Sequence, residues 1–180
     1  YSVLKANGDW VLVLDPDEEV PEKLKSRLKE ISQENKVIAV SIPRKNIFFG
    51  KWIAHSNWWP DRHVRFFKKG KVKWNNKIHN YPSVDGQLLN LDSQKDLAIV
   101  HYGYKTMSEF IDRQNTYSDI EADYLFEAGV RFSWATFFWK PTREFLVRFI
   151  RHTGFLDGFY GLALTVLMMV YQLMVMIKLW

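Results

Sequence analysis

The stretch Trp10-Val-Leu-Val-Leu-Asp15-Pro16-Asp17-Glu18-Glu19 decides how the rest of the chain is interpreted. A tryptophan and four aliphatic residues lead directly into four carboxylates, a pattern that indicates a buried strand with acids at its carboxyl end. Open α/β sheets bind their ligands at that edge. The sequence therefore predicts that Asp15 and Asp17 lie at a ligand-binding edge of an α/β fold.

The two aspartates are one residue apart, on a turn that Pro16 stiffens. They can offer oxygen ligands to one hard divalent cation, which usually keeps waters or substrate phosphates as its other ligands. A nucleotide diphosphate is the natural partner of such a site. The alternative is a solvated acidic turn that leads into a helix, where Glu18, Glu19 and Glu22 complement the helix dipole. The spacing is short, so both interpretations stay open.

Composition narrows the class of protein and of partner. The chain has 180 residues, the size of one modest domain, and carries a net charge of +5. Its basic residues cluster in 68–73 and 143–151, which favours phosphate-bearing or membrane-surface partners and no nucleic acid. Since there is no cysteine, we expect neither disulfides nor thiolate metal sites, as is compatible with a reducing compartment.

Strand and helix patterns alternate after the acidic turn. Pro21 is expected to open an amphipathic helix whose apolar face holds Leu24, Leu28 and Ile31. Residues 37–42 follow as an apolar strand that Pro43 should stop. Further strands are expected over 62–67 and over 97–100, the latter ending on His101. This alternation predicts an α/β or α+β fold.

A second helix is expected after Thr106, which forms a capping box with Glu109, and Gly129 should end it. The composition then shifts. Pro141 is expected to restart a helix with one apolar and one basic face, of the kind that lies at a membrane interface. We therefore divide the chain into an α/β domain over 1–130 and a membrane-associating tail over 131–180.

The tail ends in nineteen uncharged residues, Phe159–Ile177. About 20 such residues are needed to cross a hydrocarbon core of about 30 Å. Arg143, Arg148 and Arg151 precede this run and should hold their side on the cytoplasmic face of the membrane. Spanning, re-entrant and flat-lying arrangements stay open, and a buried core helix or a dimer element is the alternative.

Taken together, these residues resemble family 2 glycosyltransferases of the GT-A fold. The resemblance rests on Gly8 to Glu19, on an Arg-x-Phe strand at Arg65, on His79, on the His101-Tyr-Gly-Tyr strand and on the tail 154–162. It is strongest toward bacterial membrane-associated enzymes that extend lipopolysaccharide core and related cell-surface glycans. Residues 1–7 are typical of a helix end that Gly8 stops, so we expect the first nucleotide-binding β-α-β units to lie upstream.

The resemblance implies a hexosyl- or heptosyltransferase that moves a sugar from a nucleotide-sugar donor to a glycan or lipid-linked acceptor. The Asp-x-Asp carboxylates of such enzymes hold Mg²⁺ or Mn²⁺ on the donor diphosphate, which implies Asp17 as a metal ligand and Asp15 as a residue that binds the metal or the donor ribose. His101 is a further candidate ligand, although a lone histidine is more often structural. Arg65 and Arg62 are candidates for clamping the donor phosphates through their planar guanidinium groups, against the alternative of strand-face salt bridges.

An inverting transfer needs a carboxylate near the acceptor hydroxyl. Many relatives carry His-Glu where this chain has His79-Asn80, so that acid is missing. Asp61 is our candidate base, and Asp85 is a poorer one. Trp58, Trp59 and His79 are candidates for binding the acceptor, with packing of the two tryptophans as the alternative.

Two other functions fit parts of the sequence. A strand that ends in Asp-x-Asp also opens the haloacid-dehalogenase phosphatases, whose first Asp is a nucleophile, but we find no convincing later lysine and acidic pair. A membrane-tethered sugar-binding module without turnover is the non-enzymatic alternative, and a missing base would favour it.

Overall fold

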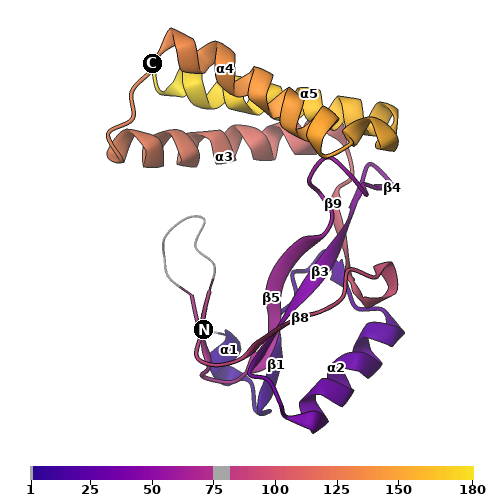
Figure 1. Cartoon of the computed structure of the whole chain (residues 1–180). Helices are drawn as coiled ribbons and strands as arrows, with labels where there is room; N and C mark the ends of the chain where they lie inside the picture. Colours follow the sequence, from indigo (N-terminus) through magenta and orange to yellow (C-terminus); the bar gives the residue numbers. More distant parts are fainter. Residues whose placement is uncertain (1, 75–81) are drawn as a thin grey trace. The chain divides into compact units, whose positions relative to one another are not determined.

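The structure is a computed structural model that describes residues 2–74 and 82–180. It divides into two compact units, the first comprising residues 1–46 and 60–102 and the second comprising residues 47–59 and 103–180. The first unit contains most of the sheet (Figure 1), and the second contains the C-terminal helices. These compact units do not test the expected domain boundary at residue 130, which stays a prediction.

The sheet has the strand order β1-β5-β3-β9-β2, with β4 and β8 also paired to β3. Its strands are β1 (Trp10–Leu12), β2 (Glu18–Glu19), β3 (Ala39–Phe48), β4 (Lys51–Trp52), β5 (Asp61–Lys68), β8 (Leu88–Asn90) and β9 (Ile99–Tyr104). Shorter elements of the first unit are α1 (Ser2–Lys5), the 3₁₀ turn Lys95–Leu97 and a second two-stranded sheet of β6 (Val72–Lys73) with β7 (Ser83–Val84). β8 runs parallel to β3 and β5 runs antiparallel to it, so the sheet is mixed and the expected α/β class is confirmed.

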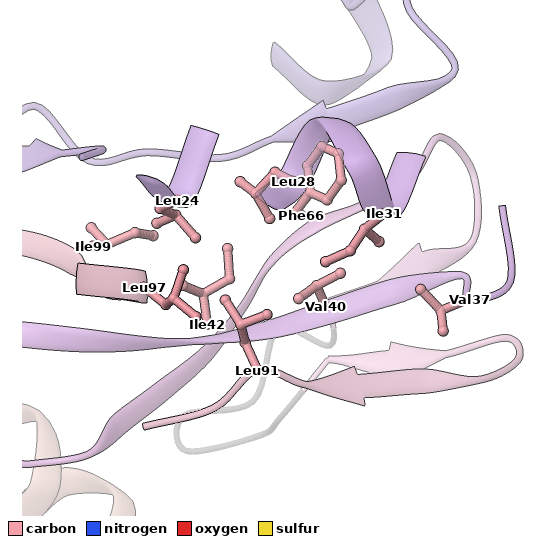
Figure 2. Packing of buried hydrophobic residues seen from close by; sticks show 10 residues of the cluster. All are labelled: Leu24, Leu28, Ile31, Val37, Val40, Ile42, Phe66, Leu91, Leu97 and Ile99. Carbon is pink, nitrogen blue, oxygen red and sulfur yellow. The ribbon is translucent and has the colours of Figure 1, made fainter. Parts of the chain in front are cut away.

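Helix α2 (Glu22–Glu34) covers one face of this sheet. Its Leu24, Leu28 and Ile31 are buried, as their spacing predicts, and pack with Val40 and Ile42 of β3 and other apolar side chains (Figure 2). Fully burying one such side chain contributes about 1.5–3 kcal/mol. The helix therefore fixes which face of β3 points to the core.

Three local expectations were wrong. Pro43 does not end its strand, because a proline φ angle suits extended backbone and its neighbours Ile42 and Arg44 still pair with β5. His101 lies within β9 and not at a strand end. Pro141 lies inside α4 (Trp134–Phe145), which begins seven residues earlier.

The first strand, β1, lies at one edge of the sheet. β1 pairs antiparallel with β5, with Val11 opposite Phe67. The acidic turn then reverses into β2, where Glu18 lies opposite His101 of β9. The acidic turn thus connects β1 to β2, and both strands belong to the mixed sheet.

The second unit contains α3 (Met107–Glu127), α4, a π-helical turn (Leu146–Arg151), a 3₁₀ turn (Gly154–Asp157) and α5 (Phe159–Lys178). α5 packs against both α3 and α4 (Figure 1). The Thr106 cap is confirmed, since its Oγ1 accepts from the Glu109 amide at 3.2 Å. Gly129 follows α3 with a φ of +82°, which suits a residue that stops a helix.

Candidate functional site

The face of the sheet under α2 changes from apolar to polar along its strands. Below the helix lie Val40, Ile42, Phe66 and Ile99. Side chains alternate along a strand, so the residues farther along on the same face are Arg44 and Asn46 of β3 and His101 of β9. On β5 the same face presents Asp61, His63 and Arg65. Phe66 pairs with Val40 and Val64 pairs with Ser41, so the register shifts by one residue between them. Arg65 has no partner residue on β3 at this β-bulge, and its side chain therefore shares a face with that of Phe66.

The acidic turn closes over this polar face through Glu18. The Glu18 side chain is 0% exposed, and its Oε1 accepts from Arg65 at 2.8 Å and from Arg44 at 3.4 Å. Its Oε2 accepts from the backbone amide of Asp15 at 2.9 Å. Arg65 also donates to Asp15 Oδ2 at 2.5 Å. Glu18 therefore holds the turn in place, a role that its position near a helix start does not predict.

Asp61 lies at the centre of a second group of contacts. Its Oδ2 accepts from Arg44 Nε at 2.9 Å, from Arg44 Nη2 at 2.7 Å and from Asn46 Nδ2 at 3.1 Å. Its Oδ1 lies 2.9 Å from His63 Nε2. Burial raises the pKa of Asp61, but hydrogen bonding to His63, the charge of Arg44 and the Asn46 amide outweigh burial and hold this pKa well below its usual range.

Asn46 connects Asp61 to His101. The ionised Asp61 carboxylate only accepts hydrogen bonds, so the amide nitrogen of Asn46 must face it. Asn46 Oδ1 then faces His101 Nδ1 at 2.6 Å, and this nitrogen must carry the proton. In the neutral ring, Nε2 consequently has the lone pair. Burial and the charge of Arg44 lower the pKa of His101 despite nearby carboxylates, which favours the neutral ring.

The lone pair of His101 lies next to Asp17. His101 Nε2 and Asp17 Oδ2 are 3.5 Å apart, so two electron-pair donors face each other. A divalent cation between them would relieve that repulsion, and a carboxylate with an imidazole fits Mn²⁺ or Mg²⁺ when waters or phosphates complete its shell. In the part of the chain that the structure describes, no group of three or more His, Cys, Asp or Glu side chains could hold a metal ion. Asp15, which binds Arg65, stays only a predicted ligand.

The predicted phosphate-binding arginines lie on different faces of β5. Arg62 points away from the polar face and donates to Ser93 Oγ at 2.8 Å. Among the described residues, buried Arg62 Nη1 and Arg65 Nε have no hydrogen-bond partner. Buried donors of this kind are uncommon and suit an anionic ligand. The structure thus leaves a donor available on each arginine but does not bring the two together on one face.

The acceptor candidates belong to other parts of the chain. Trp58 packs edge-on against Phe48 at 4.9 Å between ring centroids, and the Arg148 guanidinium lies 5.0 Å from its ring. Trp59 packs edge-on against Trp52. Both tryptophans are therefore engaged within the second unit. His79 and its neighbour Asn80 lie outside the described residues.

Our sequence interpretation missed Arg44, Asn46 and His63, and it gave Glu18 only a helix-dipole role. A signal was present in the alternation Arg44-x-Asn46 and Asp61-x-His63-x-Arg65, because a period of two places each set on one strand face. The register that sets Arg44 opposite Asp61 is not encoded within either strand.

Residues 2–85 match the family model described as glycosyl transferase family 2. This segment belongs to glycosyltransferase family 2. The resemblance stated from the sequence is thereby confirmed, and with it the GT-A-like α/β class. The matched segment contains every residue of the polar face described above except His101.

The chain is also similar to a curated protein, the lipopolysaccharide core biosynthesis glycosyltransferase LpsC of Rhizobium meliloti (strain 1021). The two are 22% identical over 171 residues, an alignment that covers 89% of this chain. The chain spans 62% of the length of that relative. No solved structure matches.

Proposed function

We propose that the protein transfers a sugar from a nucleotide-sugar donor to a lipopolysaccharide or other cell-surface glycan, with inversion at the anomeric carbon. The observation that carries this proposal is the pair of facing ligands, Asp17 Oδ2 and His101 Nε2, beside the Asp-x-Asp turn of a family 2 segment. The role of the relative in lipopolysaccharide core biosynthesis supports the choice of acceptor. The transferred sugar is a hexose or a heptose in this proposal.

The residues of the polar face divide the work of donor binding. Asp17 and His101, with Asp15 as a further candidate, hold Mg²⁺ or Mn²⁺ in this proposal. When bound, the cation neutralises the charge that develops on the leaving diphosphate. Arg65, oriented by Asp15 and Glu18, keeps its buried Nε available for a phosphate oxygen, and Arg62 is the second candidate. These contacts would orient the donor for attack from the opposite side of the sugar.

Asp61 is the candidate general base. Asp61 has the lowered pKa and the close cationic partners that make a carboxylate a weak proton acceptor. Its predicted role as base therefore competes with a positioning role, in which it orients Asn46 and Arg44. A pH profile separates these roles, because a base must lose its proton for turnover.

The acceptor would be held by Trp58, Trp59 and His79, where ring faces can stack on sugars. The protein would lie at the cytoplasmic face of the inner membrane, and the tail over residues 131–180 would keep it there. Of the described helices, α5 is the one long and apolar enough, by length and composition, to cross a membrane.

The test is donor consumption by the detergent-solubilised protein across a panel of nucleotide-sugars, with Mn²⁺, with Mg²⁺ and with EDTA. We expect one donor to be consumed in a metal-dependent manner. Asp17→Ala should reduce turnover by about 10²-fold or more, because it removes a ligand. Asp9→Ala, at an exposed acid on the other end of β1 from Asp15, is the matched control. Near-normal turnover in Asp17→Ala would contradict the ligand assignment, and metal-independent consumption would contradict the mechanism.

A further inference from the structure

Helix α5 has one exposed apolar stripe along its whole length. Phe159, Leu162, Val166, Val170 and Ile177 are all at least 40% exposed, and their spacing of three, four, four and seven residues places them on one face. No charged residue interrupts the helix before Lys178. A continuous apolar stripe of this kind indicates a surface that something covers.

The opposite face of α5 is buried against the other helices of its unit. Its Leu164, Met168, Tyr171 and Val175 belong to the apolar core of the second unit. The contacts with α3 are also polar. Lys178 Nζ donates to Asn115 and Ser118 at 2.8 Å, and the Tyr171 hydroxyl donates to Glu121. α5 is therefore fixed to α3 by both apolar and hydrogen-bonded contacts.

Helix α3 carries acids on its outer face. Asp112, Asp123 and Glu127 are exposed and recur at intervals of eleven and four residues, whereas Asp119 pairs with Lys178 of α5 at 2.6 Å. The buried residues Phe110, Gln114, Ser118 and Ala122 lie on the other face of the same helix. Since α3 and α5 pack through their buried faces, the acidic stripe of Asp112, Asp123 and Glu127 lies on the side of the pair opposite to the apolar stripe.

We infer that α5 lies flat on a lipid bilayer surface, with its apolar stripe in the acyl boundary, and does not cross the bilayer. A crossing α5 would take α3 with it and place that acidic stripe at the depth of the hydrocarbon, where charged side chains are strongly disfavoured. A flat arrangement keeps the acids in water and buries only the stripe. The inference deepens the membrane attachment proposed above.

The neighbouring segments match a surface that bears anionic headgroups. Trp134, Phe138 and Trp139 of α4 are exposed aromatic residues, as are Phe155 of the 3₁₀ turn and Phe159 at the start of α5. Tryptophan is enriched at membrane interfaces. The exposed Arg143 and Arg151 add positive charge on this part of the unit, in contrast to the acidic α3. This charge complementarity favours a bilayer over a second copy of the chain as the occupant.

The chain contains no cysteine, so single-cysteine variants can be spin-labelled without background. Labels at Phe159, Val166 and Ile177 report the stripe, and a label at Asp123 reports the opposite side. The protein is bound to vesicles of phosphatidylcholine and phosphatidylglycerol, and label depth is read from collisions with oxygen and with a water-soluble nickel complex. We expect the three stripe labels at one shallow depth and the Asp123 label in water.

Each other outcome overturns the inference in a recognisable way. A label at Val166 that is far deeper than those at Phe159 and Ile177 would show a crossing helix. Labels shielded from both collision partners, with dipolar broadening between copies, would show that a second chain covers the stripe. Failure to float with vesicles would contradict membrane attachment as a whole, whereas none of these results depends on turnover.

A pair of lysine variants tests the stripe without labels. Val166→Lys should weaken binding to the same vesicles about tenfold or more, since it places a charge in the acyl boundary. Thr116→Lys, at an exposed position of α3, is the matched control and should bind as well as the parent protein. Circular dichroism checks that both variants fold. Equal binding by the two variants would overturn the inference.

Discussion

Asn46 Oδ1 lies 2.6 Å from His101 Nδ1, and the other end of the same amide donates to Asp61. This relationship joins the candidate base to the candidate metal ligand through one side chain. Because each contact dictates the donor and acceptor of the next, Asp61 determines which nitrogen of His101 faces Asp17. The three residues should therefore be tested as one unit.

Asn46→Leu should allow His101 to adopt either neutral tautomer. Without an acceptor at Nδ1, the ring can place its proton on Nε2, and Mn²⁺ affinity should fall about 10- to 100-fold. The ¹⁵N chemical shifts of His101 report the tautomer directly, without metal, and calorimetric titration with Mn²⁺ reports the affinity.

Tyr102→Phe is a suitable comparison, because Tyr102 is the neighbour of His101 on β9 and its hydroxyl donates to Glu19 Oε2 at 3.2 Å. It should leave the His101 shifts unchanged. Retention of the Nδ1-protonated tautomer in Asn46→Leu would show that another contact sets the ring.

Glu18→Gln should destabilise the fold by about 1–3 kcal/mol, because it leaves Arg44 and Arg65 facing a neutral, buried side chain. Urea unfolding followed by tryptophan fluorescence measures the change. Glu19→Gln, next to it and exposed, should change stability by no more than about 0.5 kcal/mol. Equal effects of the two substitutions would contradict the anchoring role of Glu18.

Asp61 should make stability depend on acid pH. Its folded pKa lies below the ordinary value of 3.8, so its contribution is complete above that value. As the pH falls below about 4, the unfolded chain takes up the proton first, and this contribution is lost progressively. Urea midpoints between pH 5 and pH 3 should therefore decline less steeply in Asp61→Asn than in the parent protein. An identical slope would show that Asp61 is not held as described.

Gly161→Ala should destabilise the second unit by about 3 kcal/mol or more, beyond ordinary overpacking, because the new Cβ would lie 1.9 Å from the carbonyl oxygen of Gly154. Thermal unfolding by calorimetry measures the loss. Gly8→Ala provides the contrast, since its Cβ would meet nothing closer than 3.4 Å and its backbone needs no left-handed angle. Tolerance of alanine at Gly161 would mean that the turn before α5 can shift.

The sequence by itself determined those features that one segment encodes alone. The period of Leu24, Leu28 and Ile31 sets the buried face of α2, Thr106 marks the start of α3, and the uncharged run after Gly158 is a single helix. The acidic turn after the first strand could also be found, because aliphatic and acidic residues are adjacent in the chain. Each of these patterns reflects local geometry, which repeats every two or 3.6 residues.

Only the tertiary structure decided which side chains meet on the polar face. Arg44 and Asp61 are 17 residues apart, and Asn46 and His101 are 55 apart, so their contacts depend on strand register. A shift by one residue would turn each of these side chains to the other face. The burial of Glu18 likewise depends on two arginines from other strands. The local pattern therefore identified the acids. Long-range strand pairing decided that Glu18 is buried against arginines, that Asp61 binds Arg44 and that Asp17 faces His101.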